Sequence, residues 1–267
     1  MGDAGLRLAD TLYRVPRAAG LHPIQLRGEG GARELSSWRL CLGAGEEARF
    51  VRPDEEAVLV VQEGAAELAA GDLEARVERR GVFSQRATAL YLPPGLELRV
   101  RAGAPFEAIL VATPAAPGSG PVLIRPPQVR VASRGKGPWQ REVHDVLVAD
   151  PHPRRLLVGE TRNPPGHWSS FPPHKHDGAD GEPRLEEVYH YRIEPPQGFA
   201  QQLLYAAGGE SASHTVRDRD AVLLPYGYHP VAAAPGYRLY YLWALAGDER
   251  RLALYEDPDH RWLHDAG

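Results

Sequence analysis

Short apolar runs, separated by glycine and proline, recur along the whole chain. Runs of about four to eight apolar or β-branched residues bounded by turn-forming residues are typical of β-strands. No segment combines a sustained 3.6-residue apolar period with capping residues at both ends, so long helices are not expected. The pattern predicts an all-β protein with strands at Trp38–Leu42, Ala57–Gln62, Ala65–Ala69, Leu73–Val77, Ala89–Leu92, Leu96–Val100, Phe106–Val111, Arg155–Thr161, Glu187–Ile193, Ala200–Ala206, Ser213–Arg217, Ala221–Leu224 and Arg238–Ala246.

The two groups of predicted strands follow the same order along the chain. Each contains an apolar strand, further strands, a Pro-x-Gly turn and a final apolar strand. The turns Leu92-Pro93-Pro94-Gly95 and Leu224-Pro225-Tyr226-Gly227 occupy equivalent places. Residues 112–128 are rich in Pro, Gly and Ala and are predicted to form a linker or extended crossover. We therefore expect a duplicated β-barrel with domains at 1–125 and 126–267, preceded by a poorly ordered or locally wrapped start at 1–20.

Composition narrows the class of protein. The 267 residues carry a net charge of -4, and the pI is about 6.3, which gives no support for nucleic-acid binding. Mean hydropathy is -0.39, and no apolar run approaches the roughly 20 residues of a membrane helix. The single cysteine, Cys41, excludes an intramolecular disulfide and a cysteine-based zinc site. We expect a cytoplasmic protein with neither nucleic acid nor membrane as a partner.

The segment His174-Lys175-His176 stands apart from the other histidines, most of which are isolated in polar or proline-rich surroundings. Residues i and i+2 of a β-strand point to the same face, so His174 and His176 can converge on one ion while Lys175 faces away. The same alternation in the following strand separates Glu187 from its neighbour Glu186.

Two further residues complete the candidate site. Glu187 can join the two histidines as a carboxylate ligand, and His229 follows a tight Pro-x-Gly turn at the start of another strand. Neutral imidazoles with one carboxylate suit Zn, Mn, Fe, Co or Ni and leave room for a water or substrate. The alternative interpretation is a surface His-x-His pair and an unrelated buried histidine.

This arrangement resembles the two sequence motifs of the cupin superfamily. Several departures are visible: seven residues rather than five separate Gly166 from His174, and ten separate His176 from Glu187. The resemblance implies a bicupin, with two tandem jelly-roll β-barrels in one chain. No histidine lies in residues 60–92, so the first barrel is expected to be free of metal.

Longer segments of the second half resemble a narrower group, the 5-deoxyglucuronate isomerase family of myo-inositol catabolism. The resemblance rests on NPPGHWSSFPPHKHD, LEEVYHYRIEPPQGFAQQLLY, RDAVLLPYGYHPVAAAPGY and LYYLWALAG. That family is similar to 5-keto-4-deoxyuronate isomerase, a cupin with a His-His-Glu-His metal site. The resemblance implies one divalent metal ion, a small sugar-acid substrate and the aldose–ketose isomerisation of 5-deoxy-D-glucuronate to 5-dehydro-2-deoxy-D-gluconate.

An isomerase of this kind also needs a proton carrier and a cation for the substrate carboxylate. Glu182, in the loop before Glu187, and Tyr189, on the same strand face as Glu187, are the candidate catalytic residues. For Tyr189 and Tyr191, core packing is an equally good interpretation. Strand alternation counts against Arg192. The candidate substrate-binding residues are Arg184, Tyr191, Gln202 and Arg162.

Two other functions remain open on the sequence alone. One is a metal-dependent cupin dioxygenase, and the other is a non-catalytic cupin that binds a sugar acid. No basic segment or helix-turn-helix accompanies the second half, which disfavours a transcription regulator. We expect a homo-oligomer, in the simplest case a dimer.

Overall fold

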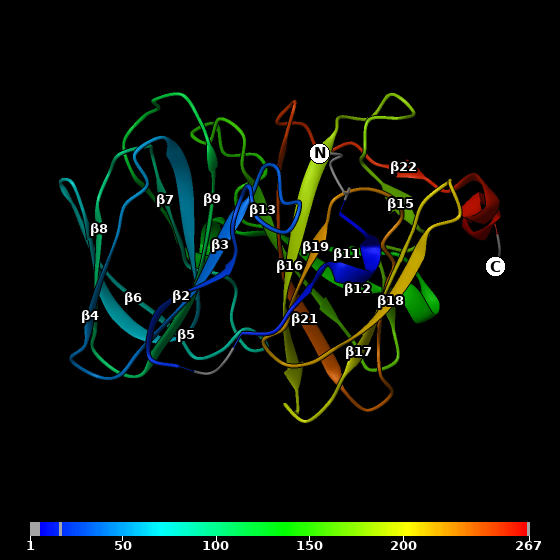
Figure 1. Ribbon diagram of the computed structural model, residues 1–267. Coiled ribbons are helices and arrows are strands. Elements are labelled where there is room, and N and C mark those ends of the chain that lie inside the picture. The colour runs from blue at the N-terminus through cyan, green and yellow to red at the C-terminus, as the bar shows by residue number, and fades with distance from the viewer. Residues whose placement is uncertain (1–5, 16–17, 266–267) are drawn as a thin grey trace.

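The computed structural model describes residues 6–15 and 18–265 and consists mainly of β-strands, which confirms the predicted class (Figure 1). One large sheet has the strand order β10-β7-β5-β9-β3-β2, and β4, β6 and β8 extend it through the long strand β5. Its strands are β2 (Gly20–Gln25), β3 (Ser36–Leu42), β4 (Glu47–Phe50), β5 (Glu55–Ala70), β6 (Leu73–Arg79), β7 (Ala89–Leu92), β8 (Leu98–Ala102), β9 (Phe106–Pro114) and β10 (Val122–Ile124). We call it the first sheet.

The second sheet has the order β1-β19-β16-β21-β13-β12-β11. Its strands are β1 (Leu12–Tyr13), β11 (Arg130–Arg134), β12 (Arg141–Asp145), β13 (Leu157–Asn163), β16 (Leu185–Glu194), β19 (Ala221–Leu224) and β21 (Arg238–Gly247). A four-stranded sheet faces it, formed by β14 (Trp168–Ser169), β20 (Val231–Ala233), β17 (Ala200–Tyr205) and β18 (Ser211–Val216). The remaining elements are β15 (His174–Lys175), β22 (Tyr255–Glu256) and the 3-10 helices η1 (Leu8–Asp10), η2 (Pro126–Gln128), η3 (Gly137–Trp139) and η4 (Pro258–His264).

The two large sheets repeat one strand order. The sequence β10-β7-β5-β9-β3-β2 corresponds to β1-β19-β16-β21-β13-β12. Register supports the correspondence: Ala57 pairs with Leu92 and Ala112, and Glu187 pairs with Leu224 and Leu245. The edge strands β1 and β10 are exchanged between the two sheets. Strand β1 precedes the strands of the first sheet in the chain but pairs with β19 of the second, whereas β10 follows them and pairs with β7 of the first.

Alternation along the strands divides the core into three parts. Val58 and Val60 of β5 pack with Leu242 and Ala244 of β21, so the two large sheets bury their outer faces against each other. The alternate residues of β5, such as Leu59 between Val58 and Val60, point to the other face of the strand. They fill the interior of the first half together with Trp38 and Phe50. The corresponding interior of the second half contains Tyr189, Tyr191, Tyr241 and Trp243. Figure 1 shows β16, β19 and β21 along the middle of the molecule.

Several sequence predictions need correction in detail. The predicted strands 57–62 and 65–69 are one strand, β5, which continues through a bulge between Val61 and Glu63. Gly64 has a φ of +94°, and a Cβ there would lie 1.9 Å from the carbonyl oxygen of Pro105. The glycine therefore permits a bulge within one strand, where the sequence pattern predicts a break between two strands.

The stretch 112–128, predicted as a linker or an extended crossover, contains regular structure. It holds the end of β9, the whole of β10 and η2, and β10 pairs with β7. Within the predicted start at 1–20, η1 and β1 pack on the second half, and Leu8 is fully buried; residues 1–5 and 16–17 lie outside the described part. None of the helices found in the described residues is long and apolar enough to cross a membrane.

Candidate metal centre

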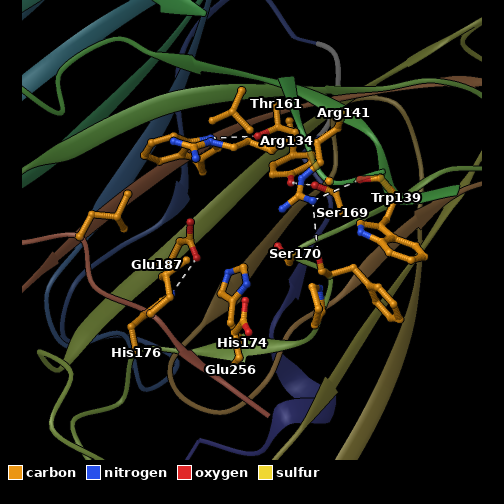
Figure 2. Close-up of a pocket in the computed structure, with 18 of the residues that line it drawn as sticks. Arg134, Trp139, Arg141, Thr161, Ser169, Ser170, His174, His176, Glu187 and Glu256 are labelled. Atoms are coloured by element: carbon orange, nitrogen blue, oxygen red, sulfur yellow. Dashed lines mark hydrogen bonds and ion pairs between the residues drawn. The ribbon is translucent and has the colours of Figure 1, made fainter. Parts of the chain in front are cut away.

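His176, Glu187 and His229 form a tight buried group, and each offers a ligand atom within 4.8 Å of the others. Nε2 of His176 lies 3.0 Å from Oε2 of Glu187, and Nε2 of His229 lies 3.4 Å from the same oxygen. Strand parity accounts for Glu187: the carboxylate of Glu186 points the opposite way and accepts the backbone N–H groups of Arg33, Glu34 and Leu35. Figure 2 shows His174, His176 and Glu187 at one side of a cavity.

A closed loop explains how His176 meets Glu187 despite the ten residues between them. The N–H of Leu185 donates to the carbonyl of His176 at 2.8 Å, and the backbones of Asp177 and Arg184 form an isolated antiparallel β-bridge. The two ends of the loop therefore lie side by side. Lys175 points away from the imidazoles, as predicted. Its ammonium contacts the loop carboxylates of Asp177, Asp180 and Glu182 at 2.5–2.9 Å. These ion pairs stabilise the loop.

Backbone carbonyls orient both buried imidazoles. Nδ1 of His176 lies 2.8 Å from the carbonyl oxygen of Leu185, and Nδ1 of His229 lies 3.0 Å from that of Gly227. Each Nδ1 therefore carries the proton it donates, and for His229 this leaves Nε2 with its lone pair. Nε2 of His229 is buried without a hydrogen-bond partner among the described residues. A buried acceptor without a donor is costly, and a cation beside it would remove that cost.

Burial governs the protonation of the group. Burial and the neighbouring His174 and His176 hold the pKa of His229 well below its usual range, and burial lowers the pKa of His174 to about 3. Burial also acts to lower the pKa of His176, but the hydrogen bond and charge of Glu187 outweigh it, so the pKa is raised. Burial raises the pKa of Glu187. His174 and His229 are thus neutral imidazoles, the form that binds metals.

His174, the fourth predicted ligand, lies at the edge of the group. Its ring centroid is 4.9 Å from that of His229, and the two rings are nearly perpendicular. It is less buried than His176 and, unlike His229, it lines the cavity. The geometry therefore gives three close ligand atoms, with His174 as a neighbouring imidazole on the cavity side.

The cavity next to the candidate metal centre measures about 760 Å³, within the range of small-molecule sites. Its floor is the inner face of the second sheet, and Tyr189 and Tyr241 form an aromatic wall with ring centroids 4.4 Å apart. The Tyr189 hydroxyl lies 2.9 Å from that of Ser170, and Ser169 hydrogen-bonds to Tyr241. Ser170 has a φ of 50°, and this left-handed turn brings two consecutive serines into contact with the wall.

The other predicted site residues divide into two groups. Tyr189 lines the cavity, whereas Tyr191 and Gln202 lie behind it and bind each other at 2.6 Å. The amide of Gln202 donates to the carbonyl of His229 at 2.8 Å, so this pair supports the ligand turn from behind. Ser169 and Ser170 also line the cavity.

Three predicted residues are not brought to the cavity. Glu182 binds Lys175 and two loop N–H groups, and this holds its pKa at about 2. Arg184 lies between Glu34 and Asp248 at 3.2 and 2.6 Å. Arg162 points to the opposite face of β13 and donates to the carbonyl of Gln85. Strand alternation assigns a face, but it does not reveal such partners.

Sequence reasoning missed a basic group on the cavity wall. Arg134, Lys136 and Arg141 all line the cavity, and they come from β11, β12 and the turn between them. Neither strand was predicted. The only signal was the two-residue spacing of Arg141, Val143 and Asp145, which a strand places on one face, and all three line the cavity.

Fold and site together define a β protein of cupin-like type with a histidine–carboxylate group that could hold a metal ion. The overall fold is similar to that of oxalate decarboxylase from Lactobacillus farciminis, with a TM-score of 0.68 and 12% identity over 100% of this chain and 92% of that one. At this identity the likeness concerns the fold alone. A much closer structure is an IolB-like protein of Salmonella typhimurium LT2, with a TM-score of 0.91 and 34% identity over 96% of this chain and 100% of that one.

Sequence comparison gives the family directly. Residues 28–263 match the KduI/IolB family. The chain is 37% identical over 237 residues to the 5-deoxy-glucuronate isomerase of Geobacillus kaustophilus (84% of each chain). It is 34% identical over 190 residues to that of Bacillus subtilis strain 168 (69% of this chain, 70% of that one). The protein belongs to the KduI/IolB family.

Proposed function

We propose that this protein converts 5-deoxy-D-glucuronate to 5-dehydro-2-deoxy-D-gluconate, the activity for which its relatives are named. The observation that carries the proposal is the group His176–Glu187–His229, placed beside a cavity of about 760 Å³ in a member of that family. The relatives favour this isomerase over the two alternatives, a dioxygenase and a non-catalytic binding protein.

The proposed cofactor is one divalent metal ion (Zn, Mn, Fe or Ni) held by His176, Glu187 and His229, with His174 as the fourth ligand. The donor set fits such an ion because the Nε2 atoms of two imidazoles converge on one oxygen of a buried carboxylate. When bound, the ion would polarise the oxygen atoms at the aldehyde end of the sugar acid.

Three further residues of the chain contribute to the proposed site. Burial keeps the pKa of Tyr189 well above its usual value, so its hydroxyl stays protonated. We therefore assign Tyr189 the role of a hydrogen-bond donor to a substrate oxygen. Tyr191 and Gln202 hold the backbone at His229 and are positioning residues.

Isomerisation moves one hydrogen from C2 of the aldehyde sugar to C1, either as a proton through an exchangeable base or as a hydride. The two routes differ in solvent exchange. Product formed in D2O carries deuterium at the former C1 in the first route and none in the second.

Three finer features belong to the same proposal. The equivalent strand orders of the two large sheets support a bicupin with two tandem jelly-roll barrels, divided near residue 125. A cytoplasmic location and a dimeric state also remain predictions. Size-exclusion chromatography with light scattering measures the oligomeric state directly.

Elemental analysis and a turnover assay with 5-deoxy-glucuronate test the function together. We expect about one equivalent of metal and turnover for the natural protein, and loss of both in His229→Ala. His22→Ala is the matched control, because His22 lies on β2 and its ring hydrogen-bonds to the carbonyl of Ala19, away from the candidate site. Undiminished activity after the metal is removed would refute the metal's role, whereas no turnover by the metal-loaded protein would refute the isomerase.

A further inference from the structure

Arg141 stands at the start of β12, on the strand face that forms the cavity wall. Its neighbours on that face, Val143 and Asp145, also line the cavity, while His144 is buried on the other side. Figure 2 shows the guanidinium of Arg141 near Ser169 and Trp139, across the cavity from His176 and Glu187. The arginine and the candidate metal centre thus occupy different sides of one space.

The guanidinium has no counter-ion within the described residues. No carboxylate oxygen there lies within 4.0 Å of it, whereas the buried Arg79 contacts Glu160 at 2.7 Å and the half-buried Arg155 contacts Glu34 at 2.7 Å. Burial lowers the pKa of Arg141, a sign that its charge is poorly solvated. A cation in such surroundings is stabilised by an anion that enters the cavity.

Two backbone carbonyls fix one nitrogen of this side chain. Nη1 donates to the carbonyl oxygens of Trp139 and Phe171 at 3.2 and 3.1 Å. Gly135 closes over the same atom: a Cβ at that position would lie 2.8 Å from Nη1 and 2.3 Å from the carbonyl oxygen of Trp139. The φ of +77° also favours glycine here. The turn 135–139 therefore holds the guanidinium in place.

The opposite edge of the guanidinium is left without partners. Nε is buried and makes no hydrogen bond, and Nη2 makes none to any described residue. Nε and Nη2 form the edge through which arginine binds a carboxylate with two parallel hydrogen bonds. Arg134 and Lys136 add positive charge to the same wall, and the Lys136 ammonium donates to the carbonyl of His264.

We infer that Arg141 binds the carboxylate of the sugar-acid substrate and so directs the opposite, aldehyde end toward His174, His176 and Glu187. This inference rests on the proposed function, since it specifies how that substrate lies. It also replaces Arg184 and Arg162 as carboxylate partners, because Arg184 is already paired and both lie outside the cavity wall.

The test compares Arg141→Gln with Arg130→Gln, a control at an exposed arginine that lies on β11 and does not line the cavity. With 5-deoxy-glucuronate, Arg141→Gln should raise KM roughly 10- to 100-fold, the usual worth of a charge-assisted pair, and lower kcat less. With 5-deoxy-glucose, which lacks the carboxylate, the variant and the natural protein should have equal kcat/KM. Arg130→Gln should leave both values unchanged.

A binding measurement makes the result independent of turnover. Calorimetric titration of the metal-loaded protein should show tighter binding of D-glucuronate than of D-glucose, and Arg141→Gln should abolish that preference without loss of metal. Arg141→Lys keeps the charge but not the planar edge, and it should retain part of the preference; it serves as the second variant if Arg141→Gln does not fold. An unchanged preference for the acid in either correctly folded variant would overturn the inference. Absence of turnover by the natural protein, with acid binding still dependent on Arg141, would instead count against the isomerase.

Discussion

The two large sheets share a strand order but differ at the positions that face inward. Glu56 on β5 and Glu186 on β16 occupy equivalent register positions, and each carboxylate accepts three consecutive backbone N–H groups from the other half of the chain. One residue further on, the strands diverge: Ala57 of the first sheet corresponds to Glu187 of the second.

The difference continues along these strands. Leu59 corresponds to Tyr189, and the interior of the first half is closed by apolar side chains such as Trp38 and Phe50. The second half replaces them with a carboxylate, imidazoles and hydroxyl-bearing rings around a cavity. The same strand order thus surrounds a packed core in the first half and a candidate reaction site in the second. A binding site needs an open cavity, whereas packing for stability alone would fill that volume with side chains.

Glu187→Ala gives the second sheet the residue, alanine, that the first sheet has at the equivalent position 57. Of the changes considered, we expect this one to lower activity most. Loss of the carboxylate should remove the metal and lower kcat/KM by about a thousandfold or more, since Lewis-acid stabilisation contributes several kcal/mol. Steady-state kinetics and elemental analysis measure both. Glu74→Ala, at an exposed position of β6, is the control. Retained metal in Glu187→Ala would exclude Glu187 as a ligand.

Ala57→Glu is the reverse exchange, and it should destabilise the protein without creating a site. Ala57 is 2% exposed in an apolar core, so an unpaired carboxylate there should cost about 3–5 kcal/mol. Urea unfolding measures the free energy, and the metal content should stay the same. An unchanged unfolding free energy would mean that the first interior is less tightly closed than the structure indicates.

Glu56→Ala and Glu186→Ala test the feature that the halves share. Each change leaves three backbone N–H groups without their acceptor, and each should lower the free energy of unfolding by about 3 kcal/mol. Thermal or urea unfolding of the two variants should therefore give similar losses. A large loss in one variant and none in the other would contradict the equivalence of the two positions.

Gln202→Leu is expected to have the smallest effect of all these substitutions, a modest loss of metal affinity. It removes the amide that supports the carbonyl of His229 and binds Tyr191, while keeping a side chain of similar size. Outer residues that orient ligands contribute about 10- to 100-fold to metal affinity, and the backbone here is held by other bonds, so we expect about tenfold. Competition with a chelator measures the affinity, and Gln201→Leu on the exposed side of β17 is the control.

Strand periodicity predicted the orientation of the central residues of the candidate site, because that orientation depends only on neighbouring positions in one strand. Alternation within one strand distinguishes Glu187 from Glu186 and turns Lys175 away from His174 and His176, and the structure has all of these orientations. The long separation between His176 and Glu187 did not spoil the prediction, because the loop closes on itself.

The basic group that lines the cavity, formed by Arg134, Lys136 and Arg141, could not be predicted in the same way. Strand β12 presents Arg141 and Asp145 to a cavity rather than to an apolar core, so its inward positions are polar and its hydrophobic alternation is lost. Arg184 looked suitable because of its place in the sequence, yet Asp248 and Glu34, far away along the chain, occupy it. Partners of this kind depend on tertiary structure, which a one-dimensional pattern does not contain.

The exchange of edge strands bears on how the protein is made. Strand β10 joins β7, which has already been synthesised, so the first sheet gains its last strand soon after residue 124 appears. Strand β1 must instead wait for β19, and Thr11 meets His214, 203 residues further along. At about 5–20 residues per second, translation of that interval takes roughly 10–40 s. During this time β1 has no partner strand, and the sheet that holds Glu187 gains this edge strand only after β19 has been made.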